Sequence, residues 1–446
     1  MGVSMKFIPN STIKNDMLKE TGLSDVDELF LDIPKQIRVK NLNISKGLSQ
    51  QETEQKLREI SNKNNNVLSF LGGGIKPHYI PPAVKSIISR SEFYTAYTPY
   101  QPEASQGFLQ AMFEYQSMIA ELTGMDIANA SLYDGATALG EAALMCSRIN
   151  QKKTFVIPQN ISWEKKSILK NYTKGPGIKI KEIPYDDKTG KIDVEKLEKN
   201  IDNDTAGIYI ENPNFFGVFE DSVDKISKIV KDAGALFVVG IDPISLGITK
   251  SPGNYGADIV IGEGRALGNP MDFGGSSLGI FACKKDFLRQ TPGRIIGMTK
   301  DTDGKRAFCM TFQTREQHIR RSKATSNICS NEGLCALTAV AFLSWLGSNG
   351  LQELSRINFE KGQKLAKTIE SVHGFEKRFT GVHFNEFVIK CHDPNKVNKD
   401  LLKRNIHGGL VLNKWYPELK DCMLFGVSEM HTDKDMEKLA SALKEV

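Results

Sequence analysis

The sequence predicts an α/β protein: a large domain with a mainly parallel sheet, followed by a smaller α+β domain. Three observations lead to this prediction. Short runs rich in β-branched and apolar residues recur between residues 67 and 283, helical stretches separate many of them, and the pattern changes after Glu332. Strands that alternate with helices in this way are typical of a parallel sheet covered on both faces.

Composition limits the class of protein further. The 446 residues are enough for about two or three domains. The 58 Lys and Arg exceed the 53 Asp and Glu by only five, so the net charge of +5 gives little reason to expect a nucleic-acid or membrane partner. Seven cysteines, an odd number without a CxxC pair, argue against a disulfide scaffold or zinc ribbon and suit a reducing cytoplasm.

Residues 1–66 are polar and charged, and we expect an N-terminal helical arm. Helices are predicted to begin near Ser11 and Ser49, and Glu52 completes a capping box with Ser49. The arm has too few apolar residues for a core of its own. The first ten residues contain no apolar signal region, and no run of about eighteen apolar residues occurs, so we expect a cytoplasmic protein without membrane contact.

The large α/β domain is predicted over residues 67–331. Seven strands are expected, at Val67–Leu71, Thr154–Ile157, Ile178–Ile183, Ala206–Ile210, Leu236–Ile241, Asp258–Ile261 and Leu278–Cys283. Helices are expected at Ser105–Leu122, Leu139–Arg148, Val194–Asn200 and Val223–Ala233. A sheet of this type places its ligand crevice at the carboxyl ends of the strands.

The smaller α+β domain is predicted over residues 332–446. Two apolar helices, Leu334–Leu346 and Leu351–Val372, precede strand-like segments at Glu386–Lys390 and Met423–Val427. A final helix is expected over Asp433–Lys444. No long linker separates the two domains, so we expect them to pack tightly.

Two motifs of the large domain are compatible with a phosphorylated ring ligand. Asp134 to Thr137, with Gly135 and Ala136 between them, precede a helix, and small residues there let backbone amides approach an anion. Asp242 ends an apolar strand, where an acid can hold a ring nitrogen protonated. Both motifs also have a structural alternative, since a tight turn before a helix is common and an Asp can simply cap the next turn.

Two further segments are candidates for contact with a ligand or a partner protein. Tyr97 and Tyr100 lie in a loop with two prolines, where tyrosines suit ligand contact or merely pack against each other. The densest basic stretch can grip phosphate or an acidic partner, or form a solvated helix face; it contains Arg315, His318, Arg320, Arg321 and Lys323. The seven histidines include no metal-ligand spacing such as HExxH, and we expect no metal.

Several long sequence segments occur in the same order as in a known family, and together they identify a family more specifically than any one motif does. They are SFLGGG from Ser69, HYIP from His78, RSEFYTAYTPYQPE from Arg90, LTGMDIANASLYDGATA from Leu122 and REQHIRRSKATSNIC from Arg315. In these segments the chain resembles the α-subunit family of the two-chain P-protein, the glycine decarboxylase of the glycine cleavage system. The resemblance runs from about Met5 to the C-terminus and is weakest beyond residue 350.

The resemblance implies the pyridoxal-phosphate-transferase fold of aspartate aminotransferase, fold type I. It also implies a reaction: glycine is decarboxylated, and the aminomethyl group passes to the lipoyl arm of the H-protein. Pyridoxal phosphate is the implied cofactor, because loss of CO2 leaves electrons on carbon that the pyridoxal ring accepts.

The lysine that this cofactor requires is missing. In this fold type the lysine follows the ring-nitrogen Asp by one strand and a short turn, but no lysine occurs between Lys250 and Lys284. The expected position falls at or near Ala266, and alanine cannot form an imine. The resemblance implies that the lysine, and with it the cofactor, belongs to a homologous β subunit, so that this chain is inactive alone.

Site residues follow as hypotheses. Tyr97 and Tyr100, with His78 and Glu103, are predicted to reach into the active site of the β subunit. Asp134, Thr137 and Asp242 are candidates for a vestigial cofactor site. The basic stretch from Arg315 to Lys323 is a possible docking surface for an acidic H-protein, and a structural role is the alternative. A purely scaffolding or regulatory subunit, without substrate contact, is the alternative function.

Overall fold

The structure is a computed structural model that describes residues 11–39, 42–64, 67–94 and 98–446. Contacts divide the chain into two compact units, Met1–Asn65 and Asn66–Val446. The second unit contains both predicted domains, so the predicted boundary between residues 331 and 332 stays a prediction.

The first unit holds two α-helices, α1 (Lys14–Glu20) and α2 (Gln50–Ser61). Ser49 and Glu52 form the predicted capping box at the start of α2. Leu18 is the one buried side chain among the residues described in this unit.

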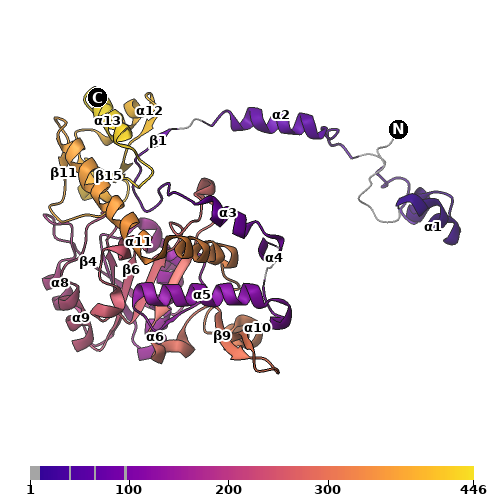
Figure 1. Cartoon of the computed structure of the whole chain (residues 1–446), viewed down its shortest axis with the longest axis horizontal. Helices are drawn as coiled ribbons and strands as arrows, with labels where there is room; N and C mark the ends of the chain where they lie inside the picture. The colour runs from indigo at the N-terminus through magenta and orange to yellow at the C-terminus, as the bar shows by residue number, and fades with distance from the viewer. Residues whose placement is uncertain (1–10, 40–41, 65–66, 95–97) are drawn as a thin grey trace. The chain divides into compact units, whose positions relative to one another are not determined.

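A seven-stranded sheet forms the centre of the second unit, in the order β2-β8-β7-β6-β5-β3-β4 (Figure 1). Its strands are β2 (Ile127–Ala128), β3 (Thr154–Pro158), β4 (Lys179–Ile183), β5 (Thr205–Asn212), β6 (Leu236–Ile241), β7 (Ile259–Glu263) and β8 (Gly279–Cys283). The five strands from β7 to β4 are parallel to one another. At the other side of the sheet, β8 pairs antiparallel with β7, and β2 pairs antiparallel with β8. The sheet is therefore mainly parallel, as the sequence predicts.

Helices cover both faces of this sheet. Successive strand residues point to opposite faces, so Val156 packs into one apolar cluster while Phe155 and Ile157 pack into another. The first cluster is shared with helices α5, α9 and α11, and the second with α6 and α7. One helix precedes the first strand of the sheet, and four lie between its later strands. They are α5 (Gln106–Thr123), α6 (Gly135–Asn150), α7 (Trp163–Lys174), α8 (Val194–Asn200) and α9 (Val223–Asp232).

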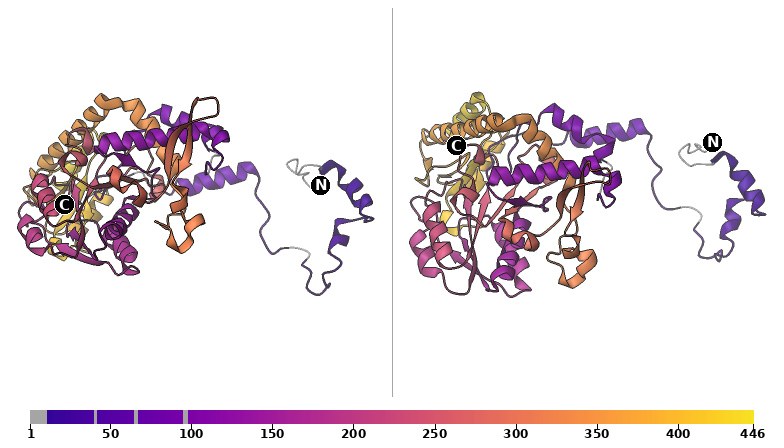
Figure 2. Two further views of the ribbon diagram at one scale, coloured as in Figure 1. Left: turned by 90° about the horizontal axis from the view of Figure 1, so that it is seen from below. Right: turned by 60° about the horizontal axis from the view of Figure 1, so that its bottom comes forward.

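A hairpin and several short helices lie beside the sheet. Strands β9 (Ile295–Lys300) and β10 (Arg306–Thr311) form an antiparallel pair that packs against α5 (Figure 2). Short helices α3 (Pro82–Ile88) and α4 (Ser91–Tyr94) precede α5, and α10 (Gln317–Arg320) follows β10.

The C-terminal part contains a four-stranded antiparallel sheet in the order β11-β12-β15-β14. Its strands are β11 (Glu376–Lys377), β12 (Glu386–Lys390), β14 (Leu410–Val411) and β15 (Cys422–Gly426), and its helices are α12 (Pro394–Leu402) and α13 (Asp433–Leu443). Strand β1 (Leu68–Ser69) pairs in parallel with β13 (Ile406–His407). The predicted strand at Val67–Leu71 therefore contributes to this part and not to the large sheet, because Phe70 fills the C-terminal core.

Helix α11 (Gly333–Glu370) joins the two parts. The sequence predicts two helices here, and the backbone breaks at Gly347, whose φ is 62° and ψ is −178°. Among the residues that the structure describes, α11 alone is long and apolar enough to cross a membrane. Half of its most apolar window is buried inside the protein.

Candidate functional site: a crevice and an exposed face

A crevice of about 460 Å³ lies at the carboxyl ends of β5, β6 and β7. The strand ends contribute Glu211, Asp242 and Glu263, and the loop before α7 contributes Ser162. Two segments from elsewhere complete the lining, namely residues 73–78 and residues 384–386. The crevice is where an open parallel sheet is expected to bind a ligand.

Ala266, the position expected for the imine lysine, lines this crevice. Two lysines also line it, but both are paired with carboxylates. The buried Lys76 Nζ lies 2.6 Å from Glu386 Oε1, which also accepts hydrogen bonds from the amides of Gly73 and Gly74. Lys165 is paired with Glu211. The crevice therefore offers no lysine that is free of an ion-pair partner.

The two acids predicted from the phosphate and ring-nitrogen motifs act as caps. Asp134 precedes α6 and its Oδ1 accepts a 2.6 Å hydrogen bond from the amide of Thr137. Asp242 lines the crevice, and its Oδ1 accepts a 2.9 Å hydrogen bond from the amide of Ile244. For both residues, the capping alternative describes the contacts that the side chain makes.

Glu263, at the end of β7, also reaches the start of α6. Its Oε2 accepts a 3.2 Å hydrogen bond from the amide of Gly135, and its Oε1 accepts from the amides of Arg265 (3.0 Å) and Leu278 (2.9 Å). Burial raises the pKa of Glu263, and the three amide donors oppose that rise.

Pyridoxal phosphate does not fit these residues. The lysine position holds alanine, and two carboxylates already accept hydrogen bonds from the first turn of α6, where a phosphate group would need the amides. We therefore derive no chemical step on this cofactor within the crevice of this chain.

His78 also lines the crevice, where it contacts Glu429. Its Nδ1 lies 3.0 Å from Glu429 Oε2, and the amide of Tyr79 donates a 2.6 Å hydrogen bond to Oε1. Burial would raise the pKa of Glu429, but His78 together with the donors Tyr79 and Asn358 lowers the pKa to about 2. His78 is thus a structural part of the crevice wall.

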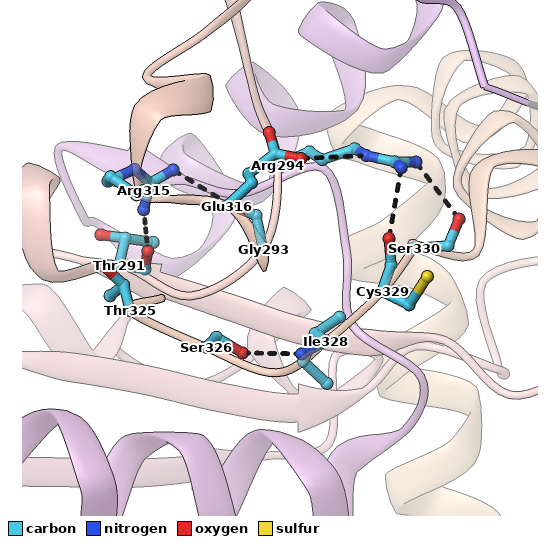
Figure 3. Close-up of a pocket in the computed structure, with 10 residues that line it drawn as sticks. All are labelled: Thr291, Gly293, Arg294, Arg315, Glu316, Thr325, Ser326, Ile328, Cys329 and Ser330. Atoms are coloured by element: carbon cyan, nitrogen blue, oxygen red, sulfur yellow. Dashed lines mark hydrogen bonds and ion pairs between the residues drawn. The ribbon is translucent and has the colours of Figure 1, made fainter. Parts of the chain in front are cut away.

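The Tyr100 loop lies against different elements. The buried guanidinium of Arg294 donates to Thr98 Oγ1 (3.3 Å) on this loop, and also to Ser330 Oγ (3.2 Å) and Asn331 Oδ1 (3.1 Å). Figure 3 shows Arg294 extended toward Cys329 and Ser330. Arg294 lies beneath the Tyr100 ring, 5.7 Å from its centroid. Tyr97 lies outside the described residues.

The basic stretch divides into an inward and an outward part. Arg315 points inward and donates to the backbone carbonyls of Thr291 and Gly293, as Figure 3 shows for Thr291. His318 lies next to Tyr100, with 6.4 Å between the ring centroids. The remaining cations of the stretch are exposed and form no ion pair with a described residue; they are Arg320, Arg321 and Lys323.

We call Tyr100, His318, Arg320, Arg321 and Lys323 the Tyr100–Lys323 face. Tyr100 is 56% exposed, and Glu103, three residues further along, is exposed as well. The structure thus brings Tyr100 next to His318 of the basic stretch, whereas it places His78 in the crevice. No group of three or more metal-ligating side chains occurs among the described residues.

Comparison with known proteins places the chain in a family. The model of the glycine cleavage system P-protein family matches residues 5–443. The chain belongs to the glycine cleavage system P-protein family. It is 51% identical over 446 residues to a protein of Thermococcus kodakarensis called probable glycine dehydrogenase (decarboxylating) subunit 1, covering 99% of this chain and 98% of that protein. A protein of the same name from Desulfitobacterium hafniense is 46% identical, with coverage of 99% and 100%.

Solved structures agree. A crystal structure of the glycine decarboxylase (P-protein) of the glycine cleavage system, in inhibitor-bound form, has a TM-score of 0.89 at 38% identity and covers both chains completely. An apo cysteine desulfurase from Thermococcus onnurineus shares the fold, with a TM-score of 0.62 at 16% identity over 90% of this chain and 99% of that one. The family resemblance and the type I pyridoxal-phosphate fold predicted from the sequence are therefore confirmed.

The chain is a P-protein subunit, and the name subunit 1 of its relatives implies a second subunit. Sequence reasoning missed two residues that organise this P-protein chain, Glu263 and Arg294. The sequence does give a weak signal for Glu263, because an acid between two glycines at the end of a predicted strand lies where ligands bind. Arg294 has no comparable local signal, since its partners Thr98, Ser330 and Asn331 come from two distant segments.

Proposed function

We propose that this chain is the subunit of a two-chain glycine decarboxylase that completes the active site of its partner. In this proposal the homologous β subunit holds pyridoxal phosphate on a lysine. The complex decarboxylates glycine and passes the aminomethyl group to the lipoyl arm of the H-protein. This chain is inactive alone, and the complex works in the cytoplasm, which suits the seven free cysteines.

One observation carries the proposal: the chain keeps a crevice of the family fold but has Ala266 at the lysine position, with Lys76 and Lys165 both paired. A lysine without a free amine cannot attack a carbonyl group until its ion pair is broken. The crevice therefore lacks the group on which the family's chemistry depends, and another chain must supply it.

The Tyr100–Lys323 face is the part of the chain that we assign to the partner's active site. It combines an exposed tyrosine with cations that have no ion-pair partner among the described residues. Tyr100 can exclude water around the carboxylate of glycine, which favours loss of CO2. The cations at its edge attract an acidic lipoyl carrier. Arg294 acts as a positioning residue, because it connects the Tyr100 loop to the segment that follows the basic stretch.

The test is glycine–bicarbonate carboxyl exchange with the co-purified complex and with each chain omitted in turn. We expect exchange only when both chains are present. Full exchange by the partner alone, or by this chain alone, would refute the proposal.

The alternative is a scaffold subunit that makes no contact with substrate. Tyr97→Ala and Tyr100→Ala, made separately in the complex, distinguish the two functions, because each removes the ring that would exclude water. A scaffold tolerates both changes as long as the complex assembles, whereas we expect a lower exchange rate with unchanged assembly.

A further inference from the structure

The start of α6 is the part of the crevice where an anion is most strongly favoured. The first amides of a helix have no partner within the helix, and the helix dipole places partial positive charge beside them. In α6 this end lies against the end of β7, so closely that a Cβ on Gly135 would lie 3.2 Å from the carbonyl oxygen of Gly262. Glycine at 135 is what allows a group on β7 to approach the amides.

The group that approaches is the carboxylate of Glu263. It bridges α6 and the two backbone segments that flank the end of β7, through the amides of Gly135, Arg265 and Leu278. A carboxylate that accepts three backbone hydrogen bonds has the same partners as a bound anion. Glu263 thus satisfies amides that would otherwise require a ligand or water.

The surrounding charges disfavour a second anion. Asp134 caps the same turn of α6, and burial together with the charge of Asp134 raises the pKa of the neighbouring Glu332. Arg265, a cation on the lining, turns one terminal nitrogen of its guanidinium toward its own loop, where it donates to Ser277 Oγ (2.7 Å) and to the carbonyl of Gly275 (3.0 Å), while its buried Nε has no hydrogen-bond partner among the described residues. A phosphate group placed here would meet the carboxylates of Glu263 and Asp134 at the amides that it would need.

We propose that Glu263 is a built-in replacement for a phosphate group: it occupies the anion-binding end of α6 and excludes phosphate-bearing ligands from the crevice of this chain. The helix start is then stable without any cofactor, whereas an enzyme that uses a bound phosphate gains that stability only on binding. This inference deepens the proposed function, because it explains how a subunit without the lysine keeps the crevice in shape and leaves the cofactor to its partner.

The test is phosphate binding by the purified full-length chain, measured by equilibrium dialysis with radiolabelled inorganic phosphate. Glu263→Ala removes the internal anion, and Glu164→Gln is the matched control, since it removes one exposed charge of the crevice lining that belongs to α7 and makes no hydrogen bond to α6 among the described contacts. We expect weak, non-saturable binding for the wild type and the control. For Glu263→Ala we expect saturable binding at least about tenfold tighter, with a phosphate-dependent rise in melting temperature.

Three results would overturn the inference. The wild type binds phosphate as tightly as Glu263→Ala, the control gains binding equally, or a folded Glu263→Ala gains none. If Glu263→Ala does not fold, the isosteric Glu263→Gln decides, because it removes the charge and keeps the shape. A folded Glu263→Gln without tighter phosphate binding also overturns the inference. The assay contains no glycine and no partner, so its outcome is independent of the exchange experiment that tests the proposed function.

Discussion

The crevice and the Tyr100–Lys323 face use their charged groups in opposite ways. In the crevice, Lys76 and Lys165 are paired with carboxylates, and Glu263 is satisfied by backbone amides. On the face, the exposed Arg320 and Arg321 have no ion-pair partner among the described residues. Internal pairing satisfies charges within the fold, whereas exposed cations without an ion-pair partner can attract a partner of opposite charge. Under the proposed function, this difference means that the crevice is a closed set of internal contacts, whereas the Tyr100–Lys323 face is the part of the chain that contacts a partner.

The largest effect on activity is expected at Arg294, which holds the Tyr100 loop in place. Arg294→Met removes the hydrogen bonds to Thr98, Ser330 and Asn331, so Tyr100 loses its position. We expect the glycine exchange rate of the complex to fall about a hundredfold, since a misplacement of about 1 Å has such an effect. Arg294→Lys should restore part of the rate.

The control is Arg148→Met, since Arg148 is a partly buried arginine that donates to one backbone carbonyl, that of Gln290. It should lower the melting temperature without a comparable loss of rate. Equal rate losses for the two variants, after correction for folded protein, would contradict the role assigned to the face.

The next largest effect is expected on stability, from a change in the wall of the crevice. Glu429→Gln weakens the contact with His78 in the crevice wall and should reduce the free energy of unfolding by about 2 kcal/mol at neutral pH. The exchange rate of the folded complex should not change. Chemical denaturation and the exchange assay measure the two quantities.

The same pair predicts a pH dependence. The pKa of Glu429 is lowered to about 2, so the folded state binds its proton less readily than the unfolded chain does. Its stabilising contribution is therefore fully present above the ordinary carboxyl pKa of about 4.5, and it is lost as the pH falls toward 2. The free energy of unfolding of Glu429→Gln should therefore fall less than that of the wild type as the pH is lowered over this range. An equal loss in the two proteins would contradict the role assigned to Glu429.

A smaller effect is expected at the edge of the face. Reversing the charge of Arg320 and Arg321 to Glu should raise the apparent KM for the H-protein about fivefold at low salt, and less at high salt. Lys434→Glu with Lys438→Glu, two exposed positions on α13, is the control and should leave the KM unchanged. An unchanged KM in the Arg320 and Arg321 variant would favour a structural role for the basic stretch.

The smallest effect is expected in the crevice. Thr137→Val and Asp242→Asn alter the two positions that the sequence predicts to correspond to phosphate and ring-nitrogen contacts, yet the exchange rate of the complex should be unchanged. A clear loss of rate in either variant, with normal assembly, would mean that the crevice takes part in the reaction.

Much of the fold could be predicted from local patterns. Strand β6 was predicted with the bounds Leu236–Ile241 because its apolar run is continuous, and Ser49 was predicted as a cap because its box with Glu52 is local. Helix α7 was missed, since its sequence WEKKSILKNYTK has few apolar residues. Strand β1 was assigned to the wrong sheet because its partner, β13, lies far away in the sequence.

The site was less predictable for the same reason. The missing lysine at Ala266 is visible in the sequence, but the pairing of Lys165 with Glu211 depends on β5 and α7 meeting in the folded chain. Tyr100 and His318 could be named as candidates, but their contact joins segments that are more than two hundred residues apart. Arg294 draws its partners from the same distant segments.

The most direct test of the central claim asks which chain holds pyridoxal phosphate. Borohydride reduction of the co-purified complex fixes the cofactor to the lysine that carries it, and mass spectrometry of the separated chains then locates the modified peptide. We predict a modified lysine on the partner subunit and none on this chain. Modification of Lys76 or Lys165 in place of a partner lysine would contradict the account.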